Sequence, residues 1–288
     1  MNNKCPYCHS VETYKNGHRD GKQRMKCKSC GKQFTIKAAI KILLVDIETA
    51  PIKALVWSVW NTNVSVEQMR SDWFVLTWSA KWLNDNEVMG EMLKPSEVKK
   101  ENDKRIIKTL WKLFDEADII IAHNGHKFDI PKLNSRFITN GLKQPSPYQV
   151  IDTLKVARQR FGFTYNRLDY LAELFGLQHK LTTGFSLWVK CLNGDANALE
   201  YMLKYNKYDV ILLEEVYLKI RGWIKSHPNI NLYQGTDSCC SNCGSENIRR
   251  KGSYTTMNNR YITYVCNDCG SFSKKSSVKK RLLSSTAR

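Results

Sequence analysis

The most distinctive hydrophobic pattern in the chain is an apolar run that ends in two acidic residues one position apart. Residues 42–49 read Ile-Leu-Leu-Val-Asp-Ile-Glu-Thr, which predicts a β-strand. Side chains alternate between the two faces of a strand, so Asp46 and Glu48 should point to the same side. Two carboxylates on one face repel each other unless a cation lies between them. The strand therefore predicts a site for a hard metal such as Mg²⁺ or Mn²⁺, although the same spacing also occurs on solvated strand faces.

Further apolar patterns predict strands that alternate with helices between residues 41 and about 225. We expect strands at 55–60, 74–82 and 88–93, a helix over 101–116 and a buried strand at 118–122. The tryptophans of this region are expected in the core: Trp57, Trp60, Trp73, Trp78 and Trp82. A helix followed by a buried strand indicates a crossover unit, so the fold class is α/β.

A third acidic residue follows the buried strand. After His123 and Asn124 the sequence reaches Asp129 and then Pro131, which is tolerated in the first turn of a helix. Asp129 should therefore lie at a helix start near the end of a central strand. An acid at this position could simply cap the helix, so both interpretations stay open here.

The fourth acidic residue lies on a helix expected over about 198–220. Tyr205 and Asp209 are four residues apart, so they share one face of this helix beside an apolar stripe. An aspartate beside an apolar stripe is costly unless a cation pairs with it. A tyrosine one turn away could reach a water molecule bound to that cation.

The charge is concentrated at the two ends of the 288-residue chain, whose formal net charge is +18. Residues 1–40 carry nine Lys/Arg against two Asp/Glu, residues 238–288 carry ten against two, and the remainder is only slightly basic. Basic ends favour a polyanionic partner, most plausibly nucleic acid. The chain has neither an N-terminal signal segment nor an apolar run of membrane-spanning length, so we expect a cytoplasmic protein with no membrane association.

Eight of the ten cysteines form four Cys-x-x-Cys pairs, two pairs near each end. The first set is Cys5, Cys8, Cys27 and Cys30, and the second is Cys240, Cys243, Cys266 and Cys269. This spacing predicts two structural Zn²⁺ sites, each held by four thiolates. Disulfides are disfavoured without a secretory signal, and a redox motif would need one pair only. Cys239 could replace Cys240 as a ligand, but the alignment of the two sets favours Cys240, and Cys191 is expected in the core.

The two cysteine-rich ends are also an internal repeat, in which the second copy has a longer middle segment. Both resemble zinc ribbons, and the first is similar to the N-terminal ribbons of insertion-sequence transposases. We therefore expect a ribbon at 1–38, an α/β domain at 39–228, a second ribbon at 236–273 and a basic, disordered tail at 274–288.

Three segments of the α/β domain resemble the motifs of the DEDD superfamily of 3′→5′ exonucleases. They are Asp46-Ile47-Glu48-Thr49, Asn124-Gly125-His126-Lys127-Phe128-Asp129 and Tyr205-Asn206-Lys207-Tyr208-Asp209. The third motif has the form of the tyrosine subclass, with Lys204 where the histidine variant would need histidine. The proofreading domains of family B DNA polymerases are the most similar members. The resemblance covers residues 41–222 and implies an RNase H-like core, a mixed sheet flanked by helices.

The resemblance also implies roles for individual residues. Asp46, Glu48, Asp129 and Asp209 would hold two Mg²⁺ or Mn²⁺ ions, and Tyr205 would orient the attacking water. Thr49, Asn124 and Phe128 would contact the substrate strand. Asp152 is expected to have a supporting, structural role. His123 and His126 flank the site but are not expected as ligands, because hard metals prefer carboxylates.

The sequence thus favours a stand-alone, metal-dependent 3′→5′ exonuclease whose zinc ribbons help to bind nucleic acid, with DNA favoured over RNA. A different class of function is an adaptor whose ribbons bind nucleic acid while the RNase H-like core is an inactive scaffold. An exoribonuclease is a further alternative, since the same chemistry serves both polymers. Transposase-like strand transfer is less favoured, because it would use another arrangement of acids. The sequence predicts no particular protein partner.

Overall fold

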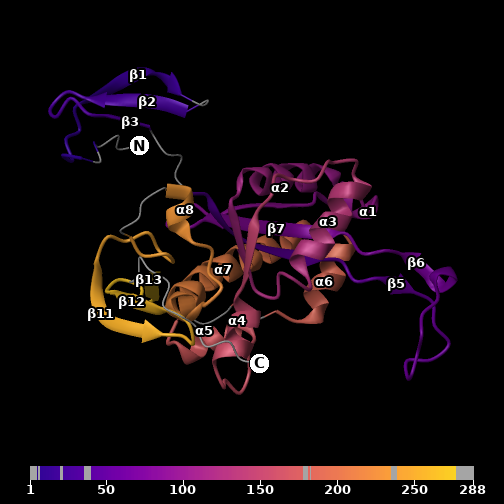
Figure 1. The fold of residues 1–288 in the computed structure, drawn as a ribbon. Helices are drawn as coiled ribbons and strands as arrows, with labels where there is room; N and C mark the ends of the chain where they lie inside the picture. Colours follow the sequence, from indigo (N-terminus) through magenta and orange to yellow (C-terminus); the bar gives the residue numbers. More distant parts are fainter. Residues whose placement is uncertain are drawn as a thin grey trace, which may run out of the picture. The chain divides into compact units, whose positions relative to one another are not determined.

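The computed structural model describes residues 5, 7–19, 22–35, 40–177, 181, 183–234 and 239–276. Two compact units are present: one comprises residues 41–228 with 269–271, and the other comprises residues 1–40, 229–268 and 272–288. The elements of the two units are shown in Figure 1. Most of the expected basic tail, residues 277–288, lies outside the described residues.

The larger unit is built on a five-stranded mixed sheet in the order β10-β9-β4-β7-β8. The strands are β4 (Ile42–Thr49), β7 (Val75–Trp82), β8 (Met89–Met92), β9 (Ile119–Ala122) and β10 (Gln149–Asp152). Strands β10, β9 and β4 are parallel, whereas β7 and β8 are antiparallel to their neighbours. The predicted α/β class is confirmed, and the expected strands at 42–49, 74–82, 88–93 and 118–122 all form.

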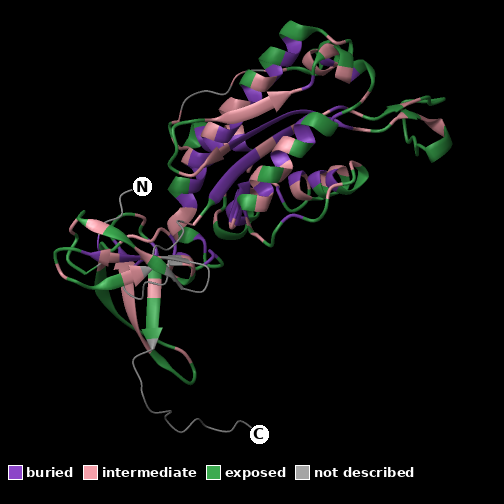
Figure 2. Cartoon of the chain, turned by 90° about the horizontal axis from the view of Figure 1, so that it is seen from above, coloured by how far each residue is buried: buried purple, intermediate pink, exposed green. Residues whose placement is uncertain are grey.

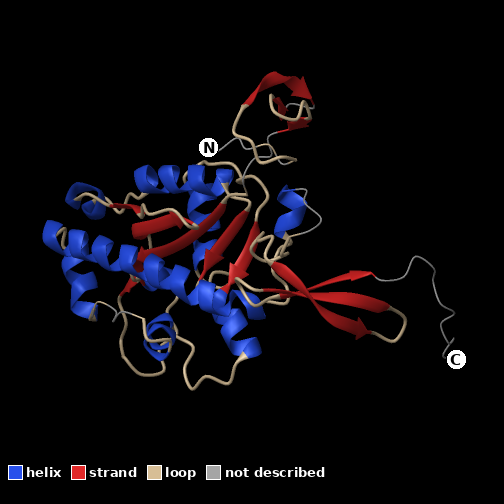
Figure 3. Cartoon of the chain, turned by 90° about the vertical axis from the view of Figure 1, so that its left-hand side faces the viewer, coloured by secondary structure: helices blue, strands red, loops and turns tan. Residues whose placement is uncertain are grey.

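Helices flank this sheet (Figure 3). They are α1 (Pro95–Lys99), α2 (Lys104–Glu116), α3 (Asp129–Thr139), α4 (Thr153–Arg160), α5 (Leu168–Leu174), α6 (Phe185–Leu192) and α7 (Ala196–Ile220), with the 3₁₀ turns η1 (Val66–Gln68) and η2 (Arg221–Trp223). Helix α7 packs directly on β4 and β7. Strand β9 is buried along its whole length, as its unbroken apolar run predicts. Figure 2 shows the buried centre of the sheet.

The expectation of a strand at 55–60 is wrong. Only β5 (Lys53–Ala54) and β6 (Met69–Ser71) pair there, and the intervening chain is a loop that projects away from the sheet (Figure 1). Trp57 and Trp60 are exposed rather than in the core. The physical reason is that residues 55–60 lack the alternation of a half-buried strand and find no third strand to pair with.

Of the three other tryptophans that were predicted to lie in the core, one is buried and two are half-buried. Trp78 is buried in the core, whereas Trp73 and Trp82 are half-buried. The Lys132 ammonium lies 3.7 Å from the centre of the Trp73 ring, a cation–π contact that leaves one side of the ring at the surface.

Asp103, at the start of α2, joins three elements of the larger unit. Its carboxylate is fully buried and accepts the Val75 N–H at 3.0 Å. The Arg136 guanidinium on α3 donates two hydrogen bonds to the same carboxylate, at 2.6 and 2.7 Å. Asn140, which ends α3, donates a further bond at 3.2 Å. The position of α3 relative to β7 therefore depends on one buried charge.

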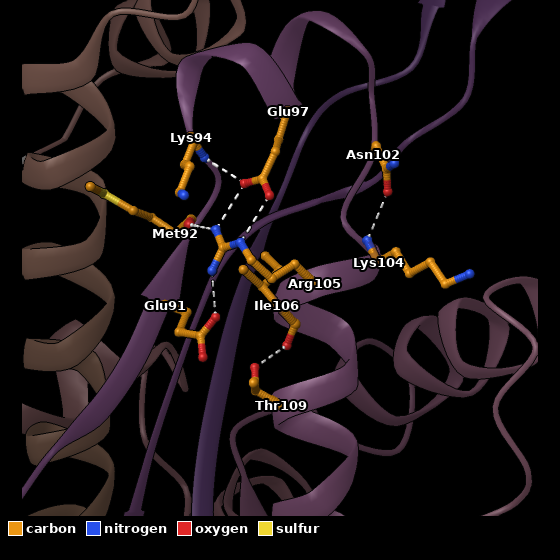
Figure 4. Close-up of polar contacts among 9 residues, drawn as sticks. All are labelled: Glu91, Met92, Lys94, Glu97, Asn102, Lys104, Arg105, Ile106 and Thr109. Carbon is orange, nitrogen blue, oxygen red and sulfur yellow. Dashed lines mark hydrogen bonds and ion pairs between the residues drawn. The ribbon is translucent and has the colours of Figure 1, made fainter.

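Arg105 joins α2 to β8 and α1 at the surface (Figure 4). Its guanidinium donates two bonds of 2.8 Å to Glu97, and it also donates to Glu91 and to the Met92 carbonyl. The hydrogen bonds from Arg105 lower the pKa of Glu97 to about 2. This cluster fixes the connection between β8 and α2.

Each terminal segment contains a separate three-stranded antiparallel sheet. The first consists of β1 (Thr13–Arg19), β2 (Lys22–Cys27) and β3 (Gln33–Thr35). The second consists of β11 (Ile248–Thr255), β12 (Arg260–Cys266) and β13 (Phe272–Ser276), preceded by the short helix α8 (Ile230–Gln234). Residues 274–276, expected in the tail, are the end of β13, because they pair with β12. Among the described helices, none is both long and apolar enough to cross a membrane.

Candidate active site and metal clusters

Three of the four predicted carboxylates meet at one point. Asp46 and Glu48 lie on β4, and Asp209 lies on α7, which packs across that strand. One carboxylate oxygen of each residue lies within 4.8 Å of the others. Asp46 and Glu48 are half-buried and Asp209 is buried. Three carboxylates at this separation repel one another, so the donor set fits a hard divalent cation.

The fourth carboxylate, Asp129, is the first residue of α3 and is only 1% exposed. Asp129 does not belong to the close group of three acids. The backbone N–H of Ile47, which lies between Asp46 and Glu48 in β4, donates a hydrogen bond to the Asp129 carboxyl and lowers its pKa. Burial outweighs that effect and raises the pKa to about 7. Its Oδ1 atom is buried and has no hydrogen-bond partner among the described residues. A buried carboxyl with an unsatisfied oxygen, hydrogen-bonded to the strand that carries Asp46 and Glu48, is a group that a bound cation would stabilise.

Asn206 is a residue of this site that the sequence analysis did not single out. It is fully buried on α7, and its Nδ2 donates a hydrogen bond of 2.5 Å to Asp46 Oδ2. Its own Oδ1 is buried without a partner in the described part of the chain. The available signal was an amide on the apolar side of a helix, three residues before Asp209.

Tyr205 is 6% exposed and lies one turn before Asp209. Burial, followed by the charges of Asp209 and Glu48, raises the pKa of its phenol well above the usual range. Tyr205 therefore keeps its proton at neutral pH. It can orient a polar group by hydrogen bonding, but it is a poor general base.

His123 and Asp152 shape the turn that leads to α3. His123 lies 2.9 Å from the Thr153 hydroxyl through Nδ1 and 2.9 Å from the Asn166 carbonyl through Nε2, so neither nitrogen points at the acids. The Asp152 carboxylate accepts the N–H groups of Asn124 at 3.0 Å and His126 at 3.1 Å. His123 and Asp152 thus hydrogen-bond to neighbouring loops, and neither belongs to the group of three acids.

Of the predicted substrate residues, Asn124 shares a cavity with two of the acids, whereas Thr49 and Phe128 are next in sequence to Glu48 and Asp129. Thr49 ends β4, and Phe128 directly precedes α3 and is half-buried. Asn124 adopts a left-handed conformation with φ of 73°. It lines a cavity of about 710 Å³ together with Asp46 and Asp209. The cavity is large enough for a nucleotide-sized ligand.

Both sets of four cysteines come together. Within each set, Cys5, Cys8, Cys27 and Cys30 or Cys240, Cys243, Cys266 and Cys269, the sulfur atoms all lie within 4.8 Å of one another. Sulfurs bound to one tetrahedral Zn²⁺ at about 2.3 Å lie about 3.8 Å apart, so both sets fit zinc. None of the ten cysteines, all of which the structure describes, forms a disulfide, and Cys240 rather than its neighbour Cys239 belongs to the second set.

Comparisons with known proteins identify the family to which the larger unit belongs. A search of curated proteins finds no significant match. The structure of the family B DNA polymerase from the hyperthermophilic archaeon Pyrobaculum calidifontis is similar at 15% identity and a TM-score of 0.43, covering 76% of this chain and 31% of that one. The chain thus spans about a third of the polymerase. The family model of the RNase_H superfamily matches residues 43–221, the whole of the sheet and the helices that carry the acids. The chain belongs to the RNase_H superfamily.

Proposed function

We propose that this protein is a metal-dependent 3′→5′ exonuclease that hydrolyses phosphodiester bonds of nucleic acid, with DNA favoured over RNA. The observation that carries the proposal is the meeting of Asp46, Glu48 and Asp209 beside the buried, protonated phenol of Tyr205. Membership of the RNase_H superfamily supports a nuclease. The direction of cleavage and the polymer are inferred from the resemblance of the three motifs to the DEDD exonucleases.

The four carboxylates would hold two divalent cations, Mg²⁺ or Mn²⁺. When bound, such cations activate water and stabilise the leaving oxygen. Asp46 and Glu48 are fixed by β4, and Asn206 holds the orientation of Asp46. Buried Asp129 approaches the same strand from α3.

Tyr205 would position the attacking water, since its phenol keeps a proton to donate. Asn124, which lines the cavity, and Phe128 would contact the substrate strand, and Thr49 would contact the terminal nucleotide. None of these roles requires a charged side chain other than the acids.

The two cysteine clusters would bind structural Zn²⁺, and their basic strands would bind the nucleic-acid backbone. Residues 1–40 and 238–288 carry most of the net positive charge of the chain. Phosphate contacts supply salt-dependent affinity that does not depend on sequence. We therefore assign affinity to the terminal segments and chemistry to the acid cluster.

The test is degradation of 5′-labelled single-stranded DNA and RNA with Mg²⁺, Mn²⁺ or EDTA. The parent protein should give a metal-dependent ladder that shortens from the 3′ end, and Asp46→Asn and Asp209→Asn should abolish it. Glu200→Gln is a matched control, because Glu200 is exposed on the same helix as Asp209.

Tight binding without cleavage would overturn the enzyme assignment. It would leave the adaptor function, in which the ribbons bind nucleic acid and the acids are inactive. Cleavage of RNA alone would keep the nuclease and replace the substrate.

A further inference from the structure

The loop that interrupts the sheet after β4 displays an unusual number of apolar side chains. We call residues 53–71, which comprise β5, β6 and the segment between them, the arm. Trp57 is 102% exposed, Trp60 and Val59 are 82% exposed, and Val66 is 85% exposed. The arm projects from the five-stranded sheet in both Figure 1 and Figure 2. These side chains therefore lie outside the core of their own unit.

The backbone of the arm is nevertheless held in place by its own hydrogen bonds. Leu55 donates its N–H to the Gln68 carbonyl at 3.0 Å, and the Gln68 amide returns a bond of 3.1 Å to the Leu55 carbonyl. The Thr62 hydroxyl donates to the Ser58 carbonyl at 2.6 Å. The exposed side chains are displayed on an ordered scaffold, which reduces the entropy lost on binding.

The exposed apolar area is larger than a monomer usually tolerates. The indoles of Trp57 and Trp60 together expose roughly 400 Å², within the range of the largest single patch on a typical monomer. Further exposed side chains of the arm are Leu55, Val56, Val59, Val64 and Val66. Their addition brings the area near the about 800 Å² that one partner contributes to a standard interface. Isolated two-stranded ribbons are also marginally stable, so covering the arm would be favourable.

The charge of the arm separates a protein partner from nucleic acid. Between Lys53 and Arg70 at its base, the arm contains no lysine or arginine and one acid, Glu67, in a chain of net charge +18. Nucleic-acid interfaces are strongly positive, whereas the centres of protein interfaces are depleted of charge and enriched in tryptophan. The arm, with two tryptophans and little charge, has the composition of a protein interface.

We propose that the arm forms the interface of a homodimer, in which the arms of two copies pack against each other. Apolar surfaces complement one another without opposite charges, so the same patch can serve on both copies of a two-fold dimer. Two chains of +18 repel each other, and the repulsion is least where the approaching surfaces are uncharged. The proposal is independent of the catalytic assignment.

The test is the molar mass of the full-length protein by sedimentation or light scattering, from about 1 to about 100 μM, a range that covers moderate dissociation constants. The parent should approach twice the 33.4 kDa of one chain. Because central tryptophans dominate interface energies, Trp57→Ser/Trp60→Ser should raise the dimer Kd about thirtyfold or more. Trp57→Phe/Trp60→Phe should retain the dimer.

Trp223→Ser is the matched control, since Trp223 is also exposed but lies on η2, outside the arm. It should leave the dimer unchanged. A parent that stays monomeric at the highest concentration overturns the proposal, as does a dimer that survives Trp57→Ser/Trp60→Ser. An oligonucleotide affinity that falls tenfold in the double serine variant while the mass is unchanged would show that the arm binds nucleic acid instead.

Discussion

Removal of the Asp103 carboxylate should destabilise the larger unit more than any other single change at a charged residue of α2. Asp103 is fully buried and accepts the Val75 N–H and two bonds from Arg136. Asp103→Ala would leave the half-buried guanidinium without its counter-ion and the Val75 N–H without an acceptor. Breaking a buried pair in this way costs about 3 to 5 kcal/mol.

Urea and thermal unfolding measure this cost. For a unit of this size each kcal/mol lowers Tm by about 2 to 4 °C, so Asp103→Ala should lower it by about 6 °C or more. Hydrogen exchange should also quicken in α3, because Arg136 and Asn140 tie that helix to Asp103. Activity should fall as well, since α3 begins with Asp129.

Glu116→Ala is the matched control on the same helix. Glu116 pairs with Lys41, and both side chains are about half exposed, so its loss should cost less than about 1 kcal/mol. If Asp103→Ala costs no more than Glu116→Ala, the inference that one buried charge holds α3 against β7 is refuted. A double-mutant cycle with Arg136→Met would then measure the interaction energy between Asp103 and Arg136 directly.

Three further predictions concern the acid cluster, the surface and the metal sites. Asn206→Ala should lower kcat about tenfold or more with little change in KM, because Asp46 loses its orienting bond, and unchanged kcat would contradict this. Since folding lowers the pKa of Glu97 from 4.5 to about 2, the pair with Arg105 should contribute about 1 kcal/mol above pH 4.5, and this is lost as pH falls toward 2. Unfolding from pH 6 to pH 2 should show the loss in the parent but not in Glu97→Gln. Elemental analysis should give two Zn²⁺ per chain and one in Cys8→Ser, whereas two in that variant would exclude Cys8 as a ligand.

The sequence was sufficient for those parts of the fold whose periodicity reflects burial. Strand β9 is an unbroken apolar run because helices cover both of its faces, and the stripe of α7 repeats at helical spacing because one side packs on the sheet. Asp46 and Asp209 could be assigned to one site before any coordinates only through the resemblance of their motifs to the DEDD exonucleases. Their approach within 4.8 Å needed the structure.

The arm shows where the same reasoning fails. Five of residues 55–60 are apolar, and four of these are valine or tryptophan, which normally predicts a buried strand. Composition describes what a segment prefers to contact but not whether its own chain supplies that contact. Here the sheet is complete without the segment, and Trp57 and Trp60 remain outside it. An apolar segment that its own fold does not cover is a reason to look for a partner.

Asp103 and Asn206 show a second limit, because both are buried polar residues whose purpose depends on a partner distant in sequence. A buried polar group is stable only when it is hydrogen-bonded, and the bond partner cannot be read from neighbouring residues. Asp103 is satisfied by Arg136, and its role is to hold a helix. Asn206 is satisfied on one side by Asp46, while its Oδ1 lacks a partner among the described residues. Asp129 Oδ1 also lacks a partner among the described residues, so two of the buried unsatisfied oxygens belong to Asp129 and to the Asn206 that holds Asp46. Asp103 therefore differs from Asn206: both Asp103 oxygens are hydrogen-bonded within the fold, whereas Asn206 keeps one acceptor that a cation or a substrate could contact.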